Sequence, residues 1–249
     1  MGALCQVREA GLRLWRDGRI GIASGPRSPL CCARGSPCTE RVANITQIAE
    51  SRIGEFVETL GSNQPAPGGG AAAGVALALA AAMVKMACGY SIGKKKYAEV
   101  ESELIAVVER CEAISKRALG LADADAVAYG EFARAMKLPR KSLEEKAVRR
   151  AALAEAARSA TAIPLELTEL CVELIDLADE TCRIGNPNLV GDAAGGGSLA
   201  RGALRICQLN VASNSSMIDD DEFVERTGTR MDAAARVLDR SDATVDRYL

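Results

Sequence analysis

The sequence predicts an all-α fold, an antiparallel bundle of about six to seven helices. Apolar residues make up 48% of the 249 positions but aromatic residues only 3%, so Ala, Leu, Val and Ile must fill the core. That composition favours closely packed helices over strands, which prefer β-branched and aromatic residues. From residue 44 onward apolar positions recur at helical spacing, and no convincing pair of strands or internal repeat interrupts them.

The chain divides into an extension, residues 1–43, and a helical domain, residues 44–249. The extension contains a stretch of Gly, Pro, Ser, Arg and Cys with almost no periodicity, which predicts disorder. Acidic Glu9 and Asp17 interrupt it, and no continuous apolar run follows, so it does not resemble a secretory signal. We interpret it as an upstream extension, with translation starting near Val42 at an alternative codon.

The first helices are predicted from their apolar spacing and their end signals. Residues 45–60 form a helix that Gly61 ends, and they place one set of apolar residues on one side: Ile45, Ile48, Ile53, Phe56, Val57 and Leu60. Residues 71–91 are nearly all small and apolar. A membrane span is the rival interpretation, but Lys85 interrupts the run, which favours a central buried helix.

The next helix carries a seam of residues at alternating spacings of four and three. Its members are Val100, Leu104, Val107, Cys111, Ile114, Ala118, Leu121, Asp125, Ala128 and Phe132. Pro139 ends it. Ser142 and Glu145 then form a capping box for a helix that runs to about Ala162, and Pro164 allows a new start or a kink. The helix after Pro164 is expected to end near Gly185, and two further helices are expected over residues 193–213 and 220–247.

Charge and residue usage exclude several functions. The net charge is −2 and the isoelectric point about 5.5, with acids and bases interspersed, which is unlike a nucleic-acid binder. The chain has no histidine, so acid–base chemistry must use Asp, Glu, Lys, Tyr or Cys. No metal site is predicted, because zinc would need several thiolates and no CxxC occurs. Cys88, Cys111, Cys171, Cys182 and Cys207 are interpreted as buried thiols of a reducing cytoplasm.

Two basic or glycine-rich segments could bind anions. Gly68, Gly69 and Gly70 precede the apolar helix, where free backbone N–H groups and the helix dipole suit a carboxylate or phosphate. The alternative is a flexible cap. Lys94, Lys95 and Lys96 lie between two helices and are either a solvated charge run or point charges for an anionic ligand.

Two acidic positions are also candidates. Asp125 occupies a place on the seam where an apolar residue is expected, so its carboxylate is either ion-paired or has a raised pKa. Asp123 points elsewhere on the same helix. The junction between two later helices contains Asn186, Asn188 and Asp192, which suit a binding site but also favour ordinary turns and caps.

In order along the chain, these blocks resemble the cyclodeaminase/cyclohydrolase family, which includes methenyltetrahydrofolate cyclohydrolases and the C-terminal domain of formiminotransferase-cyclodeaminase. The blocks are PAPGGG, SIGKKKY, ADADAVAY, KLPRKSLEEKAVRRAAL, IPLELTELC and GNPNLVGDA. The resemblance covers about residues 50–220. It implies a helical bundle that forms a homodimer with a folate cleft.

The resemblance also implies roles for the site residues. Asp125, with Asp123 beside it, corresponds to the catalytic carboxylate. The substrate-binding blocks correspond to the following residues: Gly68, Gly69, Gly70, Lys94, Lys95, Lys96, Asn186, Asn188 and Asp192. The sequence departs from the family at the last junction, where Gly191 precedes Asp192 in place of the usual Ser, and Gly195, Gly196 and Gly197 follow.

The function implied is hydrolysis of 5,10-methenyltetrahydrofolate to 10-formyltetrahydrofolate in one-carbon metabolism. No metal or redox cofactor is expected, and the partner expected is a folate substrate rather than nucleic acid or membrane. One alternative is formimidoyltetrahydrofolate cyclodeaminase, which closes the same ring and releases ammonia. A second alternative, suggested by the altered glycine stretch, is a folate-binding helical protein without catalysis.

Overall fold

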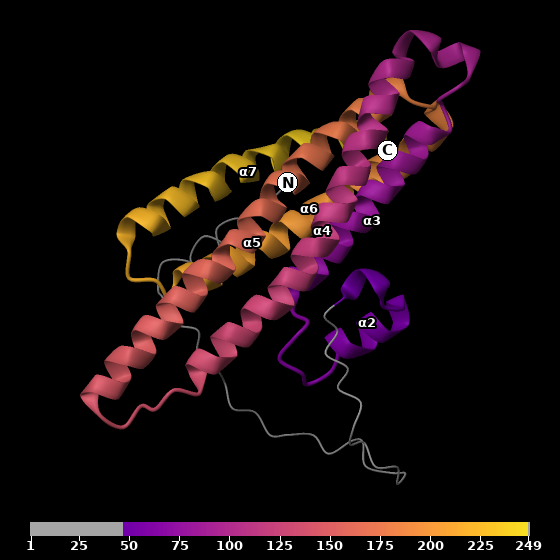
Figure 1. Ribbon diagram of the computed structural model, residues 1–249. Coiled ribbons are helices and arrows are strands. Elements are labelled where there is room, and N and C mark those ends of the chain that lie inside the picture. Colours follow the sequence, from indigo (N-terminus) through magenta and orange to yellow (C-terminus); the bar gives the residue numbers. More distant parts are fainter. Residues whose placement is uncertain (1–46, 249) are drawn as a thin grey trace, which may run out of the picture. The chain divides into compact units, whose positions relative to one another are not determined.

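The computed structural model describes residues 47–248 of the chain, and the predicted extension, residues 1–43, lies outside this range (Figure 1). Among the described residues every regular element is a helix, which confirms the all-α fold. The elements in order are η1 (Ile48–Glu50), α2 (Ile53–Leu60), α3 (Gly69–Gly89), η2 (Lys95–Val100), α4 (Glu101–Met136), α5 (Leu143–Ile184), η3 (Pro187–Leu189), α6 (Val190–Ser215) and α7 (Asp221–Tyr248).

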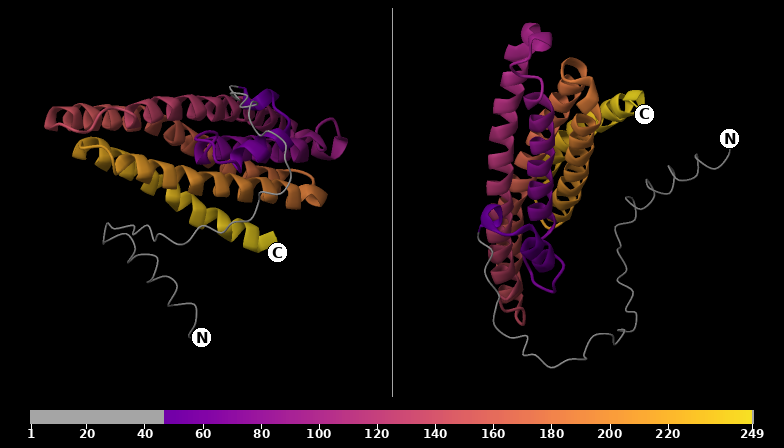
Figure 2. Two further views of the ribbon diagram at one scale, coloured as in Figure 1. Left: turned by 90° about the horizontal axis from the view of Figure 1, so that it is seen from below. Right: turned by 90° about the vertical axis from the view of Figure 1, so that its right-hand side faces the viewer.

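Helices α3, α4, α5 and α6 form a four-helix bundle. Helix α3 packs against α4 and α6, helix α5 packs against the same two, and α7 covers α5 and α6 (Figures 1 and 2). Short connections make sequential helices antiparallel, as is usual in bundles. One continuous apolar core contains residues of all five helices, among them Leu77, Leu104, Leu174, Leu204 and Leu238.

Small residues bring α3 close to its neighbours. A Cβ atom on Gly74 would lie 2.6 Å from the carbonyl oxygen of Ala118 in α4, so only glycine permits this approach. Gly196 of α6 is equally constrained, because its Cβ would lie 2.8 Å from Val84 of α3. Helix α3 is long and apolar enough to cross a membrane by length and composition, but 56% of its most apolar window is buried inside the bundle.

The seam predicted for α4 is confirmed. Residues from Leu104 to Leu121 at the predicted spacing are buried, and the later positions Asp125, Ala128 and Phe132 are only partly buried. The change occurs because α3 begins beside Asp125, so α4 continues beyond the end of its neighbour. Asp125 therefore lies where the core ends.

Helix α5 starts as predicted but does not stop where expected. Ser142 accepts a hydrogen bond from the Glu145 N–H, and the Glu145 carboxylate accepts one from the Ser142 N–H, so the capping box is present. The helix then continues through Pro164 to Ile184, so the predicted end near Ala162 was wrong. Pro164 is buried, and apolar packing on both sides of it compensates for the missing backbone hydrogen bond.

The segment predicted as one helix over residues 45–60 is divided in the structure. Ser51 adopts an extended conformation between η1 and α2, and the apolar side expected there is only partly used. Ile48 and Phe56 are buried against Ala71 and Ala122, whereas Ile53 and Val57 are exposed. Within α2 only Phe56 is buried and Leu60 partly buried, so part of the predicted apolar side does not face the bundle.

The five scattered cysteines are buried and free, as predicted. Burial raises the pKa of the Cys111 thiol to about 12 and that of Cys182 to about 11. Thiols with such pKa values stay protonated at neutral pH and are poor nucleophiles. These cysteines therefore act as small core residues.

Candidate active site

The N-terminus of α3 meets the middle of α4 at Asp125. Gly68 precedes α3 and provides no side-chain cap, and instead the Asp125 Oδ2 atom accepts a hydrogen bond of 3.0 Å from the Ala71 N–H. A Cβ atom on Gly70 would lie 2.0 Å from Asp125 Oδ1, so only glycine leaves room for the carboxylate. The predicted glycine loop and the predicted catalytic carboxylate thus form one site.

Two opposing effects act on the Asp125 carboxylate. Burial raises its pKa above the ordinary 3.8, and the Ala71 N–H, which stabilises the charged form, lowers it by less. The net direction is upward. A carboxyl group with a raised pKa exchanges protons more readily near neutral pH than an ordinary aspartate does.

No lysine or arginine of the described part of the chain forms an ion pair with Asp125. The sequence left open an ion pair for Asp125, and the described residues do not show one. The side chain is half-buried rather than sealed. It can therefore face a ligand that carries positive charge.

Asp123 has a different environment. Its Oδ1 atom accepts a hydrogen bond of 2.6 Å from the Ile48 N–H, which connects α4 to the segment before α2. The bond holds η1 against the bundle. Asp123 therefore stabilises the structure next to the site through this contact.

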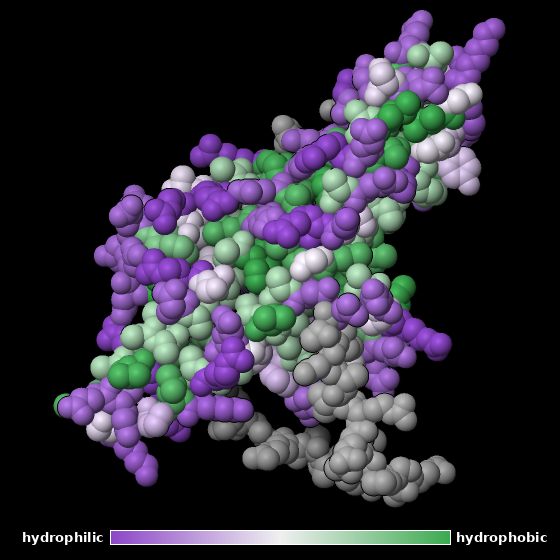
Figure 3. Space-filling view, viewed as in Figure 1, coloured by the Kyte–Doolittle hydropathy of each residue, from purple (hydrophilic) through white to green (hydrophobic). Residues whose placement is uncertain are grey.

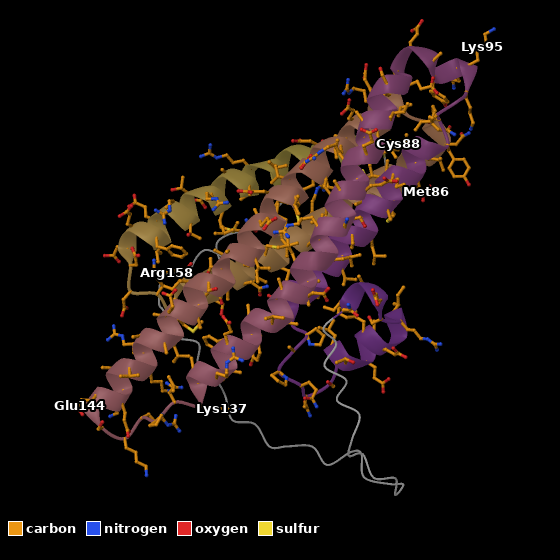
Figure 4. All side chains as sticks on the ribbon, in the orientation of Figure 1. Met86, Cys88, Lys95, Lys137, Glu144 and Arg158 are labelled. Atoms are coloured by element: carbon orange, nitrogen blue, oxygen red, sulfur yellow. The ribbon has the colours of Figure 1, made fainter. Side chains whose placement is uncertain are left out.

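The predicted lysines lie at the opposite end of α3. Helix α3 has 21 residues, so at 1.5 Å per residue its two ends are about 30 Å apart. Lys94, Lys95 and Lys96 are exposed, and Lys95 projects from the end of the bundle where α3 leads into α4 (Figure 4). The Lys94 and Lys96 ammonium groups lie 5.8 and 5.3 Å from the ring centres of Tyr90 and Tyr97. A single chain does not bring these lysines to Asp125.

The junction between α5 and α6 lies at the lysine end as well. Leu189, Val190 and Ala193 pack with Ala87 near the C-terminus of α3. Within the junction the Asn186 side chain accepts a hydrogen bond from the Asn188 N–H, an ordinary turn contact. Asp192 is in the first turn of α6 and is partly exposed.

The glycine run that departs from the family pattern has a packing explanation. A Cβ on Gly195 would lie 3.0 Å from Met83, and one on Gly197 would lie 3.2 Å from the Cβ of Ala178. With Gly196, these residues let α6 lie close to α3 and α5. Gly191, in contrast, has nothing within 4 Å of its Cβ position.

One residue beside the site was not expected. The Asn210 Oδ1 atom of α6 would lie 3.3 Å from a Cβ on Gly69, so an amide faces the N-terminus of α3. The signal was available in the sequence, because Asn210 follows Ala203 by seven residues and Cys207 by three, on the apolar side of α6. An amide at such a position indicates a hydrogen-bonding role.

Among the side chains that the structure describes, those of residues 47–238, no group of three or more His, Cys, Asp or Glu is arranged to hold a metal ion. Two surface grooves are present, one between α4 and α5 near Glu131 and one between α5 and α7 near Arg230, and Asp125 lines neither. The polar groups that the described residues bring together beside α3 are the Asp125 carboxylate, the backbone amides at the start of α3 and the Asn210 side-chain amide.

Together the fold and the site define a helical-bundle protein with a half-buried carboxylate at the N-terminus of α3. Residues 52–233 match the model of the formiminotransferase-cyclodeaminase family, and the chain belongs to this family, as the sequence blocks predicted.

Three relatives illustrate the match. Over 173 residues the chain is 40% identical to methenyltetrahydrofolate cyclohydrolase of Methylorubrum extorquens, covering 70% of this chain and 83% of the relative. It is 30% identical to formimidoyltransferase-cyclodeaminase of Rattus norvegicus, covering 74% of this chain but only 34% of that relative. The crystal structure of formiminotetrahydrofolate cyclodeaminase from Thermotoga maritima shares the fold, with a TM-score of 0.72 at 24% identity, over 80% of this chain and 96% of that one.

The raised pKa of Asp125 predicts a stability change in Asp125→Asn. The pKa of Asp125 is higher in the folded chain than in the unfolded chain, where it is near 3.8. The contribution of this carboxyl to the free energy of unfolding is therefore complete below the unfolded-state pKa and is lost as pH rises through the folded-state pKa. The variant stays neutral and keeps an oxygen for the Ala71 N–H. We expect its Tm to exceed that of the wild type at pH 7, with the difference shrinking as pH falls toward 4.

Thermal unfolding followed by circular dichroism between pH 4 and pH 8 measures this difference. A variant that melts below the wild type at pH 7, or a gap that is independent of pH, would contradict the raised pKa.

Proposed function

We propose that the chain hydrolyses 5,10-methenyltetrahydrofolate to 10-formyltetrahydrofolate. The observation that carries the proposal is the half-buried Asp125 carboxylate at the N-terminus of α3, without a cationic partner among the described residues. The methenyl substrate carries positive charge on the carbon between N5 and N10, which such a carboxylate attracts. The 40% identity to a methenyltetrahydrofolate cyclohydrolase supports the same substrate.

The reaction needs two proton transfers at one place. Asp125 takes a proton from water as the oxygen bonds to the methenyl carbon. The resulting hydroxyl loses its proton as the carbonyl forms, the bond from this carbon to N5 breaks, and Asp125 returns its proton to N5. One proton is released overall, and the formyl group remains on N10. Partial burial suits both steps, because a raised pKa makes the carboxyl a better base and still an effective acid.

The remaining site residues are assigned to binding. We propose that the amides of Gly68, Gly69 and Gly70 and the side chain of Asn210 bind pterin or carboxylate oxygens beside Asp125. Lysines 94–96 are assigned to the glutamate tail of the folate, and the junction residues Asn186, Asn188 and Asp192 to the same end of the substrate. Asp123 is proposed to support Asp125 from the same helix. No metal or redox cofactor is required by these steps.

Formimidoyltetrahydrofolate cyclodeaminase activity is the second candidate. The 30% identity to formimidoyltransferase-cyclodeaminase supports it, and the same carboxyl group could protonate the leaving ammonia. The higher identity to the hydrolase favours hydrolysis. A folate-binding protein without catalysis is the third candidate. The argument for it was the altered glycine stretch, and helix packing now explains Gly195, Gly196 and Gly197.

We further propose that the protein is a cytoplasmic homodimer with no nucleic-acid or membrane partner. Five free buried thiols support a reducing compartment. The exposed apolar side chains of Leu79, Met86 and Tyr90, on and just after α3, support self-association, because such a patch is usually covered by a partner. The net charge of −2 supports the absence of a nucleic-acid partner.

The first prediction for the function concerns Asp125→Asn, which removes the base without changing side-chain size. We expect kcat to fall by roughly a hundredfold or more. Loss of the methenyl chromophore measures turnover. Asp123→Asn is the matched control, and it should lose much less activity because its oxygen can still accept the Ile48 N–H.

Wild-type protein that leaves the methenyl chromophore unchanged but releases ammonia from the formimino substrate would support the cyclodeaminase instead. Folate binding with neither reaction would support the third candidate. Near wild-type turnover in Asp125→Asn would remove Asp125 from the mechanism.

The second prediction concerns Gly70→Ala. The added methyl group would overlap the Asp125 carboxylate, so the carboxylate must move away from the Ala71 N–H. We expect kcat to fall about tenfold or more, since misplacement of a catalytic group by about 1 Å is costly. Gly130→Ala on α4 has open space at its Cβ, and it should keep its activity and gain up to about 1 kcal/mol of stability. Equal activities of the two variants would show that the contact at Gly70 has no role.

A further inference from the structure

Aromatic residues are scarce in this chain, and two of them lie together on α4 beyond Asp125. The 249 residues include one Trp, four Tyr and three Phe. The ring centres of Tyr129 and Phe132 are 6.3 Å apart, and their planes are inclined at 47°. This separation is within the range in which aromatic rings interact. The two side chains therefore form one aromatic pair on the surface of α4.

Helical spacing places this aromatic pair on the same side of α4 as Asp125. Tyr129 follows Asp125 by four residues and Phe132 follows it by seven, and α4 is continuous over Glu101–Met136. Residues at these spacings lie one above the other on an α-helix. Long side chains of a helix lean toward its N-terminus, which is the direction of Asp125 from both rings. The aromatic pair therefore adjoins the carboxylate along the helix surface.

Core packing does not account for the aromatic pair. The seam of α4 is buried as far as Leu121, but Tyr129 is 36% exposed and Phe132 is only partly buried. Neither residue belongs to an apolar core cluster in the part of the chain that the structure describes. Here α4 and α5 continue past the start of α3 (Figure 1), and Figure 3 shows hydrophobic surface between hydrophilic residues in this part of the molecule. Tyr129 thus keeps exposed ring surface that a ligand can cover.

The charges along this side of α4 favour a cationic ligand. Asp125 has no lysine or arginine partner among the described residues, and residues 125–132 include no basic residue. The face of an aromatic ring carries partial negative charge, so it attracts a cation as the carboxylate does. Ala128, on the same side of the helix between Asp125 and Phe132, is small and leaves room for a flat molecule.

We propose that Tyr129 and Phe132 make the site specific for a positively charged ring, by binding the face of the methenyltetrahydrofolate cation next to Asp125. The charge of this cation is spread over the methenyl carbon, N5 and N10, and hydrolysis removes it. The rings therefore attract the substrate more strongly than the uncharged product. At 1.5 Å per residue, Tyr129 is about 6 Å and Phe132 about 10 Å from Asp125 along α4, which is comparable to the length of a fused ring system. This role rests on the proposed folate chemistry.

Binding to a variant with slow turnover tests this role. Isothermal titration calorimetry of Asp125→Asn protein gives Kd for methenyltetrahydrofolate and for tetrahydrofolate, which has no positively charged methenyl bridge. Adding Tyr129→Leu should weaken binding of the cation about fivefold and that of tetrahydrofolate much less, because only the cation loses a cation–π contact. Phe132→Leu should act in the same direction. Tyr129→Phe keeps an aromatic face, so it should retain the ratio of the two Kd values found for Asp125→Asn alone.

Turnover provides a second measurement. With Asp125 intact, Tyr129→Leu should lower kcat/KM for methenyltetrahydrofolate about tenfold, and Tyr129→Phe should restore most of it. Val127→Ala is the matched control, because Val127 is 59% exposed and lies two residues from Asp125, on the opposite side of α4. The control should keep the wild-type kcat/KM. Circular dichroism should show the same helical content in all three variants.

The outcomes separate this role from the function on which it rests. If Tyr129→Leu and Phe132→Leu change both Kd values by the same factor, or change neither, the rings do not recognise the charge and the proposal is wrong. Tyr129→Phe as impaired as Tyr129→Leu contradicts it equally, because the hydroxyl rather than the ring face would then act. Wild-type protein that turns over neither methenyltetrahydrofolate nor the formimino substrate contradicts the proposed function, whereas the ratio of Kd values still decides whether the rings recognise the cation.

Discussion

The contact between the N-terminus of α3 and Asp125 of α4 is the constraint on which the site depends. A helix N-terminus leaves backbone N–H groups without partners, and Gly68 offers no side chain to bind them. A carboxylate from another helix accepts one of these hydrogen bonds, at the place where the core ends and solvent begins. The dipole of α3 favours the charged form, whereas burial disfavours it. Burial is the larger effect, so the pKa of the Asp125 carboxyl lies above its ordinary value.

Close helix packing makes this contact possible. Gly74 of α3 lies against the backbone of α4, and Gly196 of α6 lies against α3, so three helices approach more closely than larger residues would allow. The same closeness leaves Gly70 no room for a Cβ beside Asp125. The small residues that replace aromatic ones in this core are therefore also the residues that allow the close contact at the site. A core of small residues lets helix ends and side chains meet at short distances.

Much of the fold could be predicted from local signals. The α4 seam, the capping box of α5 and the buried thiols depend on spacing and residue type alone. Pro164 was misleading, because the packing of α5 on α4 and α6 maintains the helix where proline would weaken an isolated one. At the site, Asp125 was recognisable as an acid on an apolar seam. The large distance between Lys94 and Asp125 was not recognisable, since it depends on helix length and direction. Asn210 was overlooked because a single amide on a helix is a weak signal.

The central claim is that Asp125 is held with a raised pKa at the end of α3. It is tested most directly by NMR titration of the protein with 13C-labelled aspartate carboxyl groups, with Asp125→Asn used to assign the resonance. The account predicts a midpoint above the ordinary 3.8 for this carboxyl group. A midpoint at or below 3.8 would show that the helix dipole and the Ala71 N–H outweigh burial, and Asp125 would then be a structural cap rather than the catalytic acid and base.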